Sequence, residues 1–73
     1  MVNIDIVQEI DGVKGQIVYA IYRLGLVLSL EEDAYNNLTE ELQDSQCGVE
    51  LSRHIDAVEL AIGRLQDVVA NLN

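Results

Sequence analysis

Apolar residues in the last third of the sequence follow an unbroken heptad spacing, which constrains the fold more than any other feature. They recur at alternating intervals of four and three residues, at Leu51, Ile55, Val58, Ile62, Leu65, Val69 and Leu72. Only a helix brings residues with this spacing onto one narrow face, which we call a seam. β-Branched residues occupy heptad position a, and most residues at position d are leucine, as is typical of paired helices. We therefore predict a helix over about 49–72 that packs lengthwise against another helix.

The first part of the chain, about 4–28, repeats this pattern. Its predicted seam has the same spacing and consists of Ile6, Ile10, Val13, Ile17, Ala20, Leu24 and Val27, with Val7, Ile21 and Leu28 on one flank. The two long amphipathic helices would therefore have matching seams. On the flank of the later seam, position g holds Ala61 and Val68 where a two-stranded zipper would carry charges. This favours a broader contact among several helices.

A shorter, acidic helix is predicted between them, over about 30–44. Ser29-Leu30-Glu31-Glu32 fits the capping box that starts a helix, and Glu31, Glu32 and Asp33 would then occupy its first turn, where the helix dipole favours negative charge. The segment 44–48 contains N-cap residues and a glycine, so we predict a break there. The alternative is one continuous helix over 30–72, which would make the fold a hairpin.

Chain length favours a single all-α domain, 1–73, that is completed by self-association as a multi-helix bundle. A chain of 73 residues is near the lower limit for an independent core. Its one cysteine, Cys47, can form no internal disulfide, so oligomerisation is the usual remaining source of stability. The N-terminus lacks the features of a signal peptide, which predicts a cytoplasmic location. The apolar run 17–30 is too short to span a bilayer, and we expect a buried helix there.

The net charge of −9 is concentrated in the middle of the chain. Segment 25–48 has no basic residue and carries Glu31, Glu32, Asp33, Glu40, Glu41 and Asp44. This acidity disfavours direct binding to nucleic acid, where phosphate contacts need Lys and Arg, and to an anionic membrane. The acidic surface has two interpretations. It could be a solvated face that keeps the protein soluble, or it could bind a basic partner, by imitating nucleic-acid phosphates for example.

No catalytic residue, metal ligand or cofactor site is expected. Cys47, Glu50 and His54 would share a helix face, but structural zinc sites usually take four ligands in recognised pairs. Cys47 with His54 is the only candidate nucleophilic dyad, and nothing supplies an orienting group or an oxyanion pocket. We expect His54 to pair with Glu50 or Asp56. The sequence therefore predicts a protein that is not an enzyme.

A second apolar stripe on the first helix lies away from the predicted seam. Its members are Gly15, Tyr19, Tyr22 and Leu26, which are spaced by four, three and four residues, together with the adjacent Val18. Tyrosine is common in interface hot spots, so Tyr19, Tyr22, Leu26 and Val18 are the predicted contact surface for a partner or a second copy. The alternative is that the acidic helix covers this stripe through Tyr35, Leu38 and Leu42.

These features together predict a small acidic, self-associating helical protein. It would bind and regulate another macromolecule through protein–protein contacts, with a protein partner that could carry a basic surface. One alternative is an acidic inhibitor that imitates nucleic acid and blocks a nucleic-acid-binding enzyme, of the kind that mobile elements encode. The other is a structural subunit whose only task is assembly.

Overall fold

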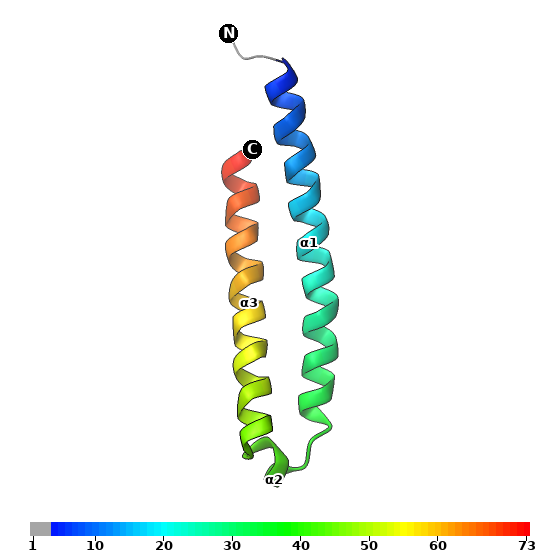
Figure 1. Cartoon of the computed structure of the whole chain (residues 1–73), viewed down its shortest axis with the longest axis vertical. Coiled ribbons are helices and arrows are strands. Elements are labelled where there is room, and N and C mark those ends of the chain that lie inside the picture. Colours follow the sequence, from blue (N-terminus) through cyan, green and yellow to red (C-terminus); the bar gives the residue numbers. More distant parts are fainter. Residues whose placement is uncertain (1–3) are drawn as a thin grey trace.

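The chain forms a helical hairpin, seen in a computed structural model that describes residues 4–73. Helix α1 spans Ile4–Asn36, the short α2 spans Glu40–Gln43, and α3 spans Gln46–Leu72. α1 and α3 lie side by side in opposite directions, with α2 at the turn (Figure 1). The N-terminal turns of α1 extend beyond the C-terminal end of α3 (Figure 1). The prediction of an all-α fold is confirmed.

The predicted seam of α3 faces α1. Its members from Leu51 to Val69 are at least partly buried, while Leu72, at the end of the helix, is exposed. Val58, in the middle of the pair, is 7% exposed and has the only buried apolar side chain among the residues described. The seam predicted for the last third of the chain is thus the one that builds the fold, and the helix begins at Gln46 rather than near 49.

The predicted seam of α1 is partly wrong. The partly buried positions on this helix are Lys14, Ile17, Ile21, Leu24, Gly25, Leu28, Glu31 and Tyr35. The predicted members Ile6, Ile10, Val13, Ala20 and Val27 are exposed. The predicted and the observed heptad patterns of α1 share Ile17 and Leu24. The observed pattern also presents the large side chains of Ile21, Leu28 and Tyr35 to α3. No residue of α1 is fully buried, so the expectation of a buried helix over 17–30 is also wrong.

No helix begins at Ser29, which lies inside α1, so the predicted capping box is wrong. Leu28 and Tyr35 are both shielded on the α3 side, and this packing outweighs a cap worth about 1 kcal/mol. The helix starts that do form use Thr39 and Ser45 as N-caps. Thr39 Oγ1 accepts a hydrogen bond from the Leu42 amide at 3.3 Å, and Ser45 Oγ accepts one from the Gly48 amide at 3.3 Å.

The predicted break within 44–48 is confirmed, because α2 ends at Gln43 and α3 begins at Gln46. A continuous helix over 30–72 is therefore excluded. The fold is nevertheless a hairpin, with its turn between Asn36 and Gln46 rather than near Ser29. The Gln43 side-chain amide donates a hydrogen bond of 3.1 Å to the Tyr35 carbonyl and so ties α2 to the end of α1.

Gly48 allows the backbone of α2 to approach the first turn of α3. A Cβ atom at this position would collide with the carbonyl oxygens of Leu42 and Gln43 and lie 2.7 Å from the Gln43 carbonyl carbon. These are backbone atoms held by helix caps, so they cannot move aside cheaply. Gly48 is therefore required by close approach rather than by its own backbone conformation, since no described glycine has a positive φ.

We expect Gly48→Ala to lower the free energy of unfolding by about 1–3 kcal/mol, the usual cost of overpacking. Gly63→Ala is the matched control in the same helix, because a Cβ there meets nothing within 4 Å. Alanine at that position should raise the free energy of unfolding by up to about 1 kcal/mol. Urea denaturation followed by circular dichroism measures both, and effects of the same sign would contradict the described turn.

Candidate interaction surfaces

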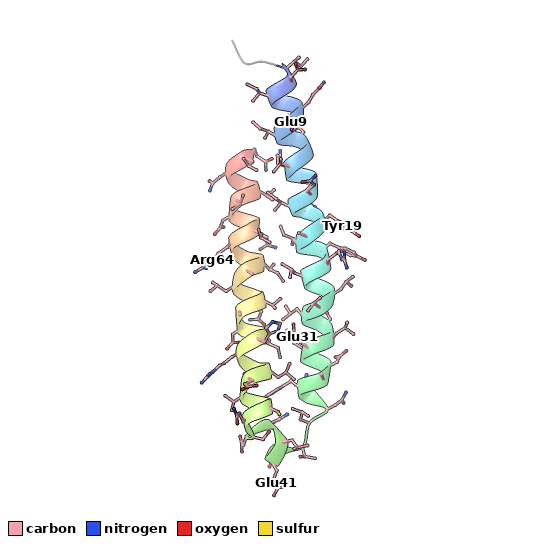
Figure 2. All side chains as sticks on the ribbon, viewed as in Figure 1. Glu9, Tyr19, Glu31, Glu41 and Arg64 are labelled. Carbon is pink, nitrogen blue, oxygen red and sulfur yellow. The ribbon has the colours of Figure 1, made fainter. Side chains whose placement is uncertain are left out.

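An apolar stripe is exposed on the side of α1 that faces away from α3. Val18, Tyr19, Tyr22 and Leu26 form it, and we call it the tyrosine stripe; Figure 2 shows Tyr19 pointing away from α3. Tyr19 is 61% exposed and Tyr22 is 62% exposed. The guanidinium carbon of Arg23 lies 5.9 Å from the centre of the Tyr19 ring, within the range of a cation–π contact. Tyr and Arg are the residue types most enriched at the energetic centres of protein interfaces.

The acidic segment does not cover this stripe, so that alternative is wrong. Tyr35 belongs to α1 itself and lies on its α3 side, partly buried. Leu38 lies between α1 and α2, and Leu42 lies in α2 and is exposed. These residues cluster at the turn because α1 continues to Asn36 instead of ending near Leu28. Within residues 4–73, no other segment packs over the tyrosine stripe.

The acidic residues gather at the turn of the hairpin, but not in the helix positions expected. Glu31, Glu32 and Asp33 lie in the last turns of α1, where the helix dipole opposes negative charge, rather than in a first turn. Glu40 and Glu41 lie in the first turn of α2, where the dipole favours them. We call the set the acidic end, made up of Glu31, Glu32, Asp33, Glu40, Glu41 and Asp44. Glu41 marks its tip in Figure 2.

One member of the acidic end is drawn into the seam. The side chain of Glu31 points toward α3 (Figure 2) and contacts Nδ1 of His54. It is only 13% exposed, whereas His54 is 65% exposed, and the Oε1 atom of Glu31 has no hydrogen-bond partner. The expectation that His54 pairs with Glu50 or Asp56 is therefore wrong. Glu31 occupies a seam position between Leu28 and Tyr35, which is not predicted when a new helix is expected to start at Ser29.

Among residues 4–73 there is no cluster of His, Cys, Asp and Glu side chains that could hold a metal ion, and no pocket is found. Cys47 is exposed and free.

α1 is also long and apolar enough to cross a membrane. Its most apolar window of 18 residues has a mean hydropathy of 1.2 and is 0% buried within the chain. The core helix of a soluble protein and a signal sequence can meet the same criterion of length and composition. α1 is longer than the apolar run 17–30, which is too short by itself to span a bilayer, because the helix continues through the acidic residues to Asn36.

No known protein-family model, curated protein or solved structure matches this chain. The function is therefore argued from the surfaces themselves.

We expect Glu31→Leu to raise the free energy of unfolding by about 1 kcal/mol or more, because it replaces a mostly buried, incompletely paired carboxylate by an apolar side chain in a helix seam. Glu32→Leu is the control. It removes the same charge from an exposed neighbour and should change the free energy of unfolding by no more than about 0.5 kcal/mol. Thermal or urea denaturation measures both variants, and a less stable Glu31→Leu variant would contradict the seam position of Glu31.

Proposed function

We propose that this chain is a small self-associating helical protein that binds and regulates another protein through the tyrosine stripe of α1. The observation that carries the proposal is the stripe itself: two tyrosines, each more than 60% exposed, between Val18 and Leu26 on a face that the described chain leaves uncovered. Tyrosine buries a large area at low cost in side-chain entropy, which suits it to the centre of an interface. The proposal assigns the chain a binding role and no catalytic one.

A protein covers this stripe better than a lipid bilayer would. Arg23 lies beside Tyr19 near the middle of α1, and α3 runs alongside with charged residues at similar depth, among them Glu59 and Arg64. A charged side chain at the centre of a bilayer costs about 3 kcal/mol or more. A hairpin inserted along α1 would bury several such charges. A protein partner can leave Arg64 in water, because it points away from α1 (Figure 2).

We expect replacement of both Tyr19 and Tyr22 by Ser to weaken partner binding at least about 30-fold, the loss of one hot spot of about 2 kcal/mol or more. The partner is first captured in the source cell by a photo-crosslinking amino acid at Tyr22. The same amino acid at Arg64, which points away from α1 (Figure 2), is the control. Affinity is then measured by calorimetry with the purified partner.

A variant in which both tyrosines are replaced by Phe is the complementary test of the tyrosine stripe. Phe keeps the ring and most of its apolar area, so this variant should retain most of the affinity. If position 22 forms only adducts with a second copy of this chain, or if position 64 gives the same adducts as position 22, the stripe is not the partner site. Unchanged affinity of the Ser variant would lead to the same conclusion.

A second candidate function is favoured by the acidic end. Its six carboxylates lie at the turn of the hairpin, on the last turns of α1 and on and beside α2, instead of being spread along the rod. Such a cluster supports an inhibitor that imitates nucleic-acid phosphates and occupies the basic site of a nucleic-acid-binding enzyme. Association through this end would be fast and sensitive to salt.

If the acidic end binds the partner, changing Glu40, Glu41 and Asp44 to Gln should slow association and flatten its dependence on salt, because long-range attraction to basic residues is lost. Stopped-flow or surface-plasmon measurements between 50 and 500 mM salt, about a threefold change in Debye length, give the slope. Changing the isolated Asp67 to Asn on α3 is the control. If the association rates of the triple variant and of the native chain depend on salt in the same way, solubility is the remaining role of the acidic end.

A further inference from the structure

The observed pairing of α1 with α3 places a second, continuous apolar face on one side of the hairpin. In α1 the seam heptad assigns position d to Ile17, Leu24 and Glu31, so position g falls on Val13, Ala20, Val27 and Ala34. In α3 the corresponding g positions hold His54, Ala61 and Val68. Because the helices are antiparallel, their g flanks lie on the same side of the pair, and the Glu31–His54 contact marks that side.

The two sides of the hairpin differ in chemistry. On the g side the two helices contribute the valine–alanine face, which consists of Val13, Ala20, Val27, Ala34, Ala61 and Val68, and His54 lies on the same flank nearer the turn. Its three valines are all more than 40% exposed. On the opposite side, position e of α3 holds the polar residues Ser52, Glu59 and Gln66, and position e of α1 holds Val18, Gly25 and Glu32. The e side is therefore polar on α3 and carries Val18 of the tyrosine stripe on α1, whereas Val and Ala predominate on the g side of both helices.

We infer that a second copy of this chain packs on the valine–alanine face, so that two hairpins form a four-helix bundle. The inference rests on the self-association in the proposed function and names the surface that provides it. A folded monomer of 8.1 kDa is expected to expose about 4,500 Å². The chain exposes 5762 Å², which is roughly 1,300 Å² more. A standard interface covers about 800 Å² on each partner, so the excess surface is enough for a stable dimer.

The composition of the face suits a copy of itself. Ala20, Ala34 and Ala61 alternate with the valines, and small side chains allow helix axes to approach to about 8 Å. None of the six residues is charged, although the chain carries a net charge of −9. A two-fold symmetric contact requires a surface that complements itself, which an uncharged face of valine and alanine provides.

The acidic end sets the direction of the second copy. Its carboxylates would lie side by side in a parallel dimer and repel each other, whereas an antiparallel dimer places them at opposite ends of a rod 61 Å long. The bundle is therefore antiparallel. The tyrosine stripe occupies heptad positions b, e and f of α1, away from the valine–alanine face, so both stripes stay on the outside of the dimer and remain free for partners.

Light scattering after size exclusion tests the assembly with the native chain. We expect a mass of twice 8.1 kDa at micromolar concentration. Ala20→Glu places a charge in the valine–alanine face and should raise the dimer dissociation constant at least about 100-fold. Ala70→Glu is the matched control, because Ala70 is exposed on the other flank of α3, and this variant should remain dimeric. A native mass of one chain, or of three or more, would overturn the inference.

The single cysteine allows the relative direction of the two copies to be measured without any substitution. Cys47 is exposed near the turn and about 20 Å along α3 from Ala61 in the middle of the face. Spin labels on Cys47 in the native dimer should therefore be about 40 Å apart or more in antiparallel order, and under about 20 Å in parallel order. This distance tests the assembly even if the Ala20→Glu variant loses the dimer because it unfolds. A short distance would overturn the antiparallel bundle.

Two further outcomes separate this inference from the proposed function. If the Tyr19 and Tyr22 double Ser variant becomes monomeric while Ala20→Glu remains dimeric, the tyrosine stripe is the self-association surface and the inference is wrong. If no partner is captured by the stripe while the native chain remains an antiparallel dimer, the proposed function fails and the inference stands.

Discussion

The strip of apolar contact between α1 and α3 is the interaction on which every other feature depends. It sets which face of each helix is inside, and therefore which faces are left for other molecules. It is also thin, because two helices can shield only one stripe of each other, and Val58 alone among the described apolar side chains is buried. A hairpin of this kind has little apolar burial to offset the entropy of ordering 73 residues. Its remaining apolar faces are thus the natural place for further stabilisation.

The sequence predicts α3 well and α1 only in part, for one physical reason. α3 has a single apolar stripe with polar residues around most of the helix, so its periodicity has one solution. α1 carries apolar residues on nearly every side, and several heptads fit it equally well. Only the partner helix selects among them, through large residues such as Leu28, at the end predicted for the helix, and Tyr35, beyond that end. The local capping signal at Ser29 is real chemistry, but it is weaker than this packing.

The same limit applies to the surfaces. The tyrosine stripe can be found from spacing alone, but whether another segment covers it depends on where the chain turns. The contact between Glu31 and His54 joins residues 23 positions apart, and no local pattern predicts it once the first helix is assumed to end early. The fold distributes the roles around the rod. One face of α1 pairs with α3, a second joins the valine–alanine side, and a third presents Tyr19 and Tyr22.

The Glu31–His54 contact has a consequence for the alignment of the two helices. Apolar seams built from Leu, Ile and Val tolerate sliding by one heptad, because each seam residue then meets another of similar size. A slide of seven residues would move Glu31 from His54 to Ala61 or Cys47 and leave its carboxylate shielded from water without its partner. The carboxylate of Glu31 in the seam therefore favours one alignment of the two helices. It costs stability in the correct alignment and costs more in every other, and it holds the turn, the acidic end and the exposed faces in one fixed relation.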